Sequence, residues 1–253
     1  MRIALITAAG ISSRFNEGVE ENQKRLKAIY TDGDASHTLL ARLTDKCSYA
    51  DRIIVVGGYK YDELKQYVRT KLPAEIRKKI ILIYNEFYRE LASGYSLYLG
   101  LEEAFRHPDL EEILFAEGDL DMDRDSFEAV INLEGTVLTC SYKPIEASRD
   151  VVLYRDDKGS YRYIFNCSHG CLKIDDYFSC IYNSGQIWKF ADMEALKEAN
   201  RIFGSGEKDG TNLKIIQEYI NRIPQEKITV AGLQRWTNCN TRQDYMRIKK
   251  GWI

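Results

Sequence analysis

Residues 2–15 read Arg-Ile-Ala-Leu-Ile-Thr-Ala-Ala-Gly-Ile-Ser-Ser-Arg-Phe, and this stretch decides the fold. The apolar run from 2 to 9 stops at Gly10, a pattern typical of a buried parallel strand that opens into a loop. A single Arg before the run makes a weak start for a secretory signal, so we interpret it as a strand and expect a cytoplasmic, bacterial protein.

Similar apolar runs recur through the first half and alternate with helical patterns. We predict strands at 52–56, 80–84 and 113–116, and helices at 39–47, 62–68 and 97–105. This alternation favours an α/β fold with a mainly parallel sheet that helices cover on both faces.

The second half has a different pattern of strands and helices. Strands are predicted at 136–142, 150–154 and 161–165, with a hairpin turn at 157–159. Helices are predicted at 193–202 and 213–223, a late strand at 227–230 and a closing helix at 242–249. We place a nominal seam near residue 135 and expect one domain over 1–253, whose halves 1–135 and 136–253 share a sheet.

Composition narrows the function classes. The chain has 253 residues, with 36 Lys and Arg against 38 Asp and Glu, so its formal charge is −2. This balance excludes a nucleic-acid coat or a polybasic membrane binder, and no apolar run reaches the length of a membrane span. Six scattered cysteines indicate reduced thiols.

The loop after the first strand is the first candidate site. Its small residues let backbone N–H groups approach a phosphate, and Arg14 and Lys24 can neutralise it. It lacks the endings of a Walker loop and the glycines of a dinucleotide fingerprint. The alternative is a tight turn with solvated charges.

The second candidate is Gly118-Asp119-Leu120-Asp121, directly after an apolar strand. Side chains two apart in an extended segment point the same way, so both carboxylates can face one Mg²⁺ ion. An acidic solvated turn is the alternative, since Asp123 and Asp125 continue the run.

These motifs resemble the nucleoside-triphosphate transferases. The likeness rests on residues 8–15 with Lys24, and on the segments 56–59, 83–86, 88–90, 95–96 and 244–245. Within this family it is strongest to the bacterial cytidylyltransferases that activate phosphocholine. The resemblance implies a Rossmann-like three-layer α/β/α domain with a mixed, mainly parallel sheet and an acceptor-binding insertion.

The resemblance also implies roles for individual residues. Arg14 would grip the β- and γ-phosphates of CTP, and Lys24 would bridge the α-phosphate and the acceptor. Mg²⁺ would be held by Asp119 and by Asn240, which stands in place of the usual Asp. The spacing of the two carboxylates adds Asp121 to these expected metal ligands. The expected nucleotide-binding residues are Ala8, Ala9, Gly10, Ile11, Ser12, Ser13, Gly58, Asn85, Ser93, Ser96 and Gly118.

The chain departs from this family at several positions. Ser12 replaces the second glycine of the loop, and Ala92-Ser93 replaces two Asn. A Trp that would cage choline is expected near residue 150, where the chain has Arg149-Asp150. We therefore expect an acceptor other than phosphocholine, a small anionic phospho-zwitterion held by Arg149, Asp150, Tyr182 and Trp188. A plain surface ion pair is the alternative for Arg149-Asp150.

The predicted reaction transfers CMP from CTP to a phosphorylated or phosphonate zwitterion, such as phosphoglutamine, aminoethylphosphonate or phosphocholine, for surface polysaccharide or capsule decoration. Alternatives are a sugar-1-phosphate nucleotidyltransferase, a glycosyltransferase that uses Asp119-Leu120-Asp121, or a silent nucleotide-binding protein. We expect no nucleic-acid or membrane partner, and a monomer or homodimer. A zinc site at Cys167, His169 and Cys171 is not expected, because a fourth ligand is missing locally.

Overall fold

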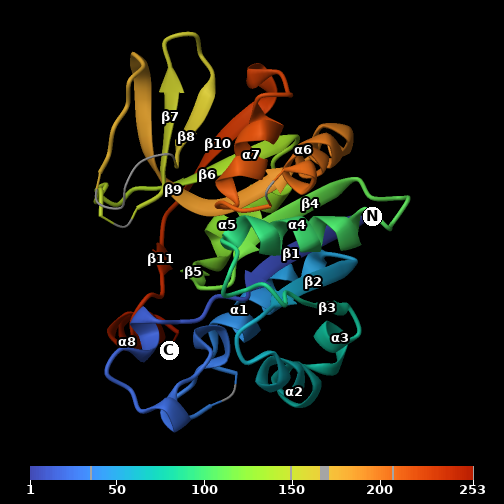
Figure 1. Cartoon of the computed structure of the whole chain (residues 1–253), viewed down its shortest axis with the longest axis vertical. Coiled ribbons are helices and arrows are strands. Elements are labelled where there is room, and N and C mark those ends of the chain that lie inside the picture. The colour runs from blue at the N-terminus through green and yellow to red at the C-terminus, as the bar shows by residue number, and fades with distance from the viewer. Residues whose placement is uncertain (35, 149, 166–170, 207, 253) are drawn as a thin grey trace.

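The computed structural model describes residues 1–34, 36–148, 150–165, 171–206 and 208–252. Within them, nine strands form one sheet (Figure 1). Seven of these strands follow the order β10 (Ile228–Leu233), β6 (Thr136–Ser141), β9 (Phe178–Phe190), β4 (Glu112–Glu117), β1 (Arg2–Ala8), β2 (Arg52–Gly57) and β3 (Ile80–Tyr84). The pairs β4–β1, β1–β2, β2–β3 and β10–β6 are parallel, so the predicted mixed, mainly parallel sheet is confirmed.

Strand β9 joins the two halves of the chain. It runs antiparallel to both β4 and β6 and lies between them, so strands from both sides of residue 135 belong to one sheet. The sequence analysis missed this strand, because its polar residues Asn183, Ser184 and Gln186 interrupt the apolar pattern. All three are buried in the structure.

Helices cover both faces of the sheet. One apolar cluster packs α1 (Leu39–Lys46), α2 (Tyr61–Lys71) and α5 (Arg124–Asn132) against one face. A second cluster packs α4 (Ser93–Ala104), α6 (Met193–Ser205) and α7 (Leu213–Ile220) against the other face. A short helix, α3 (Ala74–Arg77), precedes β3. The three-layer arrangement expected from the sequence is confirmed (Figure 1). None of the described helices has the length and apolar character needed to cross a membrane.

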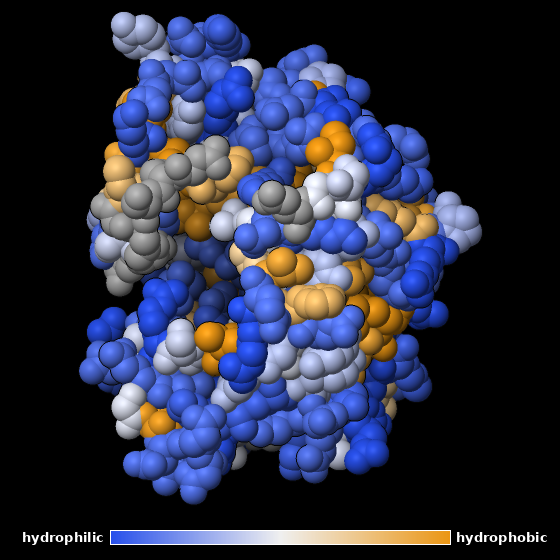
Figure 2. Space-filling model, viewed as in Figure 1, coloured by the Kyte–Doolittle hydropathy of each residue, from blue (hydrophilic) through white to orange (hydrophobic). Residues whose placement is uncertain are grey.

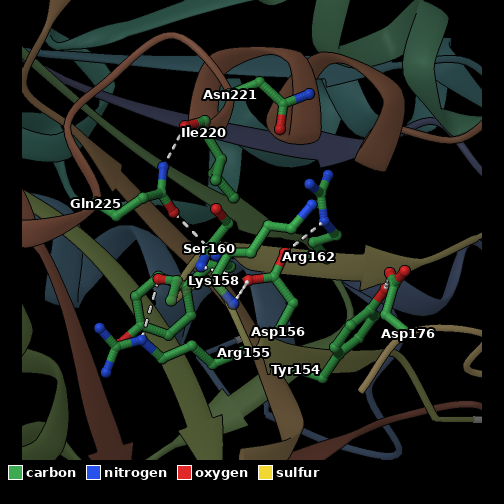
Figure 3. Close-up of polar contacts among 12 residues, drawn as sticks. Tyr154, Arg155, Asp156, Lys158, Ser160, Arg162, Asp176, Ile220, Asn221 and Gln225 are labelled. Carbon is green, nitrogen blue, oxygen red and sulfur yellow. Dashed lines mark hydrogen bonds and ion pairs between the residues drawn. The ribbon is translucent and has the colours of Figure 1, made fainter. Parts of the chain in front are cut away.

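A three-stranded arm extends from the sheet at the end of β9. It consists of β7 (Val152–Asp156), β8 (Tyr161–Ile164) and the first half of β9. The Asp156 carboxylate holds the predicted hairpin turn together: it accepts hydrogen bonds from the backbone N–H groups of Lys158 and Ser160 and from Arg162 Nε (Figure 3). Gln225 accepts from the Tyr161 N–H, which fastens the arm to the segment after α7. These contacts give the arm a defined position.

A small antiparallel pair, β5 (Leu120–Met122) with β11 (Trp236–Asn238), leads to the last helix, α8 (Arg242–Lys250). Thr241 and Asp244 form a capping box at the start of α8. The Asp244 carboxylate also accepts from the N–H of Asn240, which fixes this residue just ahead of the helix. Phe15, Leu39 and Tyr245 belong to a third apolar cluster, which attaches α8 to the loop that follows β1.

Candidate functional site

The loop after β1 is held between the ends of two neighbouring strands. The Ala9 carbonyl accepts from the Tyr59 N–H at 3.1 Å, and the Thr7 carbonyl accepts from the Gly118 N–H at 2.9 Å. A Cβ atom on Gly58 would lie 2.9 Å from the Ala9 oxygen, and one on Gly118 would lie 2.7 Å from the Thr7 oxygen. Both glycines therefore allow the backbone segments to approach one another closely.

Ser12 has a φ of 56°, a left-handed conformation that favours glycine, as expected from the family pattern. Its hydroxyl accepts from the Lys27 N–H at 3.2 Å. Asn16 reinforces this link, since its Nδ2 donates to the carbonyls of Ser12 and Arg25. These bonds hold the segment around Lys27 against the loop that follows β1.

A cavity of about 400 Å³ opens at the carboxyl ends of β1 and β4. We call it the nucleotide cavity, after the ligand that the sequence analysis expects there. Its lining includes the expected metal ligand Asp119 and eight of the eleven expected nucleotide-binding residues, namely Ala8, Ala9, Gly10, Ile11, Asn85, Ser93, Ser96 and Gly118. Ser12 and Gly58 are not among the lining residues, but both contact the segments that form this edge.

The far wall of the nucleotide cavity is the start of α4. Asn85 is buried and donates from Nδ2 to Ser96 Oγ at 2.9 Å, so its role includes fixing this wall. The Ser93 hydroxyl accepts from the Asn212 N–H, and Asn212 Nδ2 donates to Glu117 at 2.8 Å. Asn212, which the sequence analysis missed, thus ties the start of α7 to two residues of the cavity.

Lys27 and Asp119 form the main ion pair of the nucleotide cavity. Lys27 Nζ lies 2.5 Å from Asp119 Oδ2, and both side chains line the cavity. The neighbouring Glu117 is also in the lining, where burial and then the charge of Asp119 raise its pKa to about 7. Sequence reasoning missed both Lys27 and Glu117. The only signal for Lys27 is its position between the apolar residues Leu26 and Ala28, which are buried.

Lys24 lies outside this cavity. Its ammonium pairs with Glu21 at 2.6 Å, and this contact raises the Lys24 pKa. With Ser13 and Arg14 it lines an adjoining hollow of about 930 Å³ that also includes Arg89. The structure therefore brings Lys27, rather than Lys24, to Asp119.

Arg14 connects this second hollow with a third. Its Nη2 donates to Asn240 Oδ1 at 2.9 Å, and the Cys239 N–H donates to the Asp119 carbonyl at 2.8 Å. Three of the expected residues, Arg14, Asp119 and Asn240, are therefore brought together across more than two hundred residues of sequence.

The prediction that Asp121 faces the same ion as Asp119 is wrong. Its side chain is 1 % exposed, and its carboxylate contacts Arg235 and accepts a hydrogen bond from Trp252 Nε1 at 2.9 Å. The prediction assumed a continuous extended segment. A turn at Gly118-Asp119 separates β4 from β5, so the two carboxylates point in different directions.

The third hollow, of about 420 Å³, lies between the arm and α8. We call it the acceptor-side hollow, and Figure 2 shows the surface hollowed between these elements. Its lining includes Arg14, Lys143, Pro144, Glu146, Asp150, Asn183, Trp236, Asn240, Asp244 and Arg247. Asp150 is thus placed near Asn240, whereas Arg149 lies outside the described residues.

The other two expected acceptor-binding residues are elsewhere. Trp188 is 1 % exposed, stacks on Phe115 with ring centroids 5.1 Å apart, and donates to the Tyr163 hydroxyl. It is a core residue, so the prediction that it binds the acceptor is wrong. Tyr182 is half-buried against the same apolar cluster and is absent from the described lining of the acceptor-side hollow.

The residues of the nucleotide cavity fit a magnesium ion. Asp119 Oδ1 is buried and has no hydrogen-bond partner among the described residues, although Oδ2 pairs with Lys27. An anionic oxygen left in this state is a ligand that a hard cation prefers. The backbone bond from Cys239 to Asp119 brings the neighbouring residue Asn240 toward this edge, where its amide oxygen accepts from Arg14. Within the described ranges no group of three or more His, Cys, Asp or Glu side chains is placed to hold a metal. Of the residues considered and rejected for a zinc site, Cys167 and His169 lie outside the described residues.

Comparisons with known proteins agree with this geometry. The chain is 33 % identical over 96 residues to a choline-phosphate cytidylyltransferase of Haemophilus influenzae; the match spans 38 % of this chain and 37 % of the relative. The resemblance to nucleotidyltransferases inferred from the sequence is confirmed by this match and by the structures below.

Solved structures share the fold over the whole chain. A CTP:phosphocholine cytidylyltransferase from Streptococcus pneumoniae superposes with a TM-score of 0.66 and 14 % identity, covering 100 % of this chain and 99 % of that one. An inositol-1-phosphate CTP transferase from T. maritima gives 0.68 and 16 %, covering 99 % and 97 %. The sequence profile described as "Domain of unknown function (DUF6564)" matches residues 23–252. The protein therefore belongs to this family.

Proposed function

We propose that this protein is a nucleotidyltransferase that transfers CMP from CTP to a small phosphorylated or phosphonate zwitterion and releases pyrophosphate. The observation that carries the proposal is the Lys27–Asp119 pair, at 2.5 Å, in a cavity that begins at the loop after β1. A cation beside a carboxylate suits the binding of a metal-bound phosphate chain at this loop, which supports the proposal.

The chemistry is an in-line displacement. An oxygen of the acceptor phosphate attacks the α-phosphorus of CTP, and the bond from this phosphorus to the bridging oxygen breaks as pyrophosphate takes its electron pair. The acceptor oxygen is already ionised at neutral pH, so no general base is required. Positioning and charge stabilisation supply the catalysis.

Each cation has a place in this reaction. Lys27 would contact the α-phosphate and the incoming acceptor, which is the role that the sequence assigned to Lys24. Arg14, between the second and the acceptor-side hollows, would hold the phosphates that leave. Mg²⁺ held by Asp119 and Asn240 would offset the negative charge of the triphosphate.

One alternative is weakened by the structure. A glycosyltransferase reading relied on Asp119 and Asp121 acting together on one ion, but the Asp121 carboxylate is occupied by Arg235 and Trp252. A CDP-linked product suits decoration of a surface polysaccharide, and we extend the proposal to that use.

The test is pyrophosphate release by the purified protein with Mg²⁺ and each of CTP, UTP, ATP and GTP, against a panel of phosphorylated acceptors. We expect CTP to be used fastest, together with a small amino-phosphate or aminophosphonate. Faster release with UTP and a sugar 1-phosphate would replace the proposal by a sugar nucleotidyltransferase, and no release with any combination would refute it.

A further inference from the structure

The acceptor-side hollow carries an inference about the acceptor, which rests on the proposed function. Arg14 and Asn240 line it, so it opens beside the residues that connect to Asp119. A small molecule whose phosphate reaches the nucleotide would extend its other end into this hollow. The groups that line the hollow determine which terminal group of the acceptor can bind in it.

The aromatic ring of this lining is already covered. Trp236 is 4 % exposed and belongs to the apolar core beneath the sheet. The ammonium of Lys143 lies 5.5 Å from its ring centroid. A quaternary ammonium binds well where an aromatic face is free. Here it would have to displace a cation of the same sign, so the hollow disfavours such a group.

The polar groups of the hollow include an acceptor that a hydrogen-bond donor of a ligand would satisfy. Asn183 is 3 % exposed, and its Nδ2 donates to the Pro144 carbonyl at 3.2 Å and to Asp150 Oδ2 at 2.9 Å. Both partners can only accept, which fixes the orientation of the amide. Asn183 Oδ1 is then an acceptor, and it is buried without a partner among the described residues.

Asp150 adds negative charge beside this amide. Its Oδ2 also accepts from the Glu146 N–H at 2.7 Å, so the carboxylate is held in place at the wall of the hollow. A ligand group with N–H bonds and a positive charge satisfies both Asp150 and Asn183. A trimethylammonium has no N–H to give to either residue.

We propose that the acceptor carries a primary ammonium at the end away from its phosphate, and that Asp150 and Asn183 select it over a quaternary ammonium. The covered face of Trp236 acts in the same direction. A hydrogen-bonding site thus takes the place of an aromatic cage at this position of the fold.

Phosphoethanolamine and phosphocholine form a matched pair of probes, since they differ only in the three methyl groups on nitrogen. With CTP and Mg²⁺ we expect kcat/KM for phosphoethanolamine to exceed that for phosphocholine about tenfold or more, as for one hydrogen bond left unmade at a buried group. Equal values, or a preference for phosphocholine, would overturn the proposal.

Variants connect the preference to the residues. Asp150→Asn keeps the size of the side chain and removes its charge, so the ratio of the two kcat/KM values should fall toward one. Lys143→Met removes the cation that lies over the Trp236 ring, and the ratio should also shift toward phosphocholine. Asp62→Asn, on the exposed surface of α2, is the matched control and should keep the wild-type ratio. Thermal unfolding confirms that each variant is folded, and an unchanged ratio in folded Asp150→Asn would count against the assignment.

Calorimetric titration separates this inference from the proposed function. Both probes are titrated into the protein with Mg²⁺ and α,β-methylene-CTP, which cannot turn over. Tighter binding of phosphoethanolamine without any turnover of CTP would support the hollow's preference and refute the reaction. Equal binding, or no binding of either probe, would refute the preference even if other acceptors react.

Discussion

Asp119 and Asp121 are two residues apart, yet they belong to regions of opposite character. Asp119 lines a cavity, and one of its oxygens has no partner in the described part of the chain. Asp121 is enclosed by Arg235, Arg42 and Trp252, with both oxygens engaged. A carboxylate with an unpaired oxygen is available to a ligand, whereas a carboxylate with both oxygens paired stabilises the fold.

The largest effect is expected at the cation beside Asp119. Lys27→Met should lower kcat about a thousandfold, because it removes the positive charge nearest to the proposed α-phosphate. Initial rates of pyrophosphate release measure this loss.

Lys24→Met is the matched control for this variant. The Lys24 ammonium is occupied by Glu21 outside the nucleotide cavity, so kcat should change by less than about tenfold. If Lys24→Met proves as damaging as Lys27→Met, the sequence-based assignment of Lys24 is restored.

Asp119→Asn should lower kcat about a hundredfold and raise the Mg²⁺ concentration needed for half-maximal rate. The substitution keeps the shape of the side chain but removes the charge on the proposed metal ligand. A magnesium titration of the rate provides the measurement, and an unchanged half-maximal concentration would remove Asp119 from the metal site.

Asp121→Asn should act mainly on stability. The buried carboxylate offsets two guanidinium groups, and we expect the free energy of unfolding to fall by about 2 kcal/mol, less than for a fully buried pair because both Arg side chains are partly exposed. Urea unfolding measures the change. A normal magnesium requirement in this variant would separate it from Asp119→Asn, and a raised one would break the comparison.

Glu117 provides the smallest test. Its pKa is raised to about 7, so between about pH 4.5 and 7 the folded protein holds a proton that the unfolded chain releases. Without metal, stability should therefore decrease as the pH rises through this window. In the Glu117→Gln variant, the Tm should change with pH by roughly 3 °C less across this window than in the wild-type protein. Thermal unfolding in EDTA at several pH values tests it, and an unaltered slope would contradict the raised pKa.

The first half of the fold was predictable because its strands and helices have regular apolar periods. Strands β1 to β4 were each found within about one residue, and the loop at Gly10 was recognised from the run that it ends. Backbone binding groups such as Ala9 and Gly118 follow from chain position, since any strand end at this edge faces the same cavity.

The roles of individual side chains could not be predicted from apolar periods or from chain position. Strand β9 is buried although it is polar: Asn183 Nδ2 donates to the Pro144 carbonyl and to Asp150, and the Ser184 hydroxyl accepts from the Gln186 N–H. Trp188 and Trp236 were not distinguishable by sequence, and only packing shows that the first is a core residue while the second borders a hollow. Lys24 and Lys27 likewise differ only in what the loop fold brings next to them.

The long separation between Asp119 and Asn240 has a consequence for synthesis on the ribosome. The nucleotide cavity is assembled from early strands, but Asn240 and α8 leave the exit tunnel roughly 120 residues after Asp119, about ten seconds later at common elongation rates. During that interval Asp121 lacks its contacts with Arg235 and Trp252, and Arg14 lacks its contact with Asn240. These contacts can therefore form only once α8 has been made, so translation products that stop before α8 would be less stable and, under the proposed function, inactive.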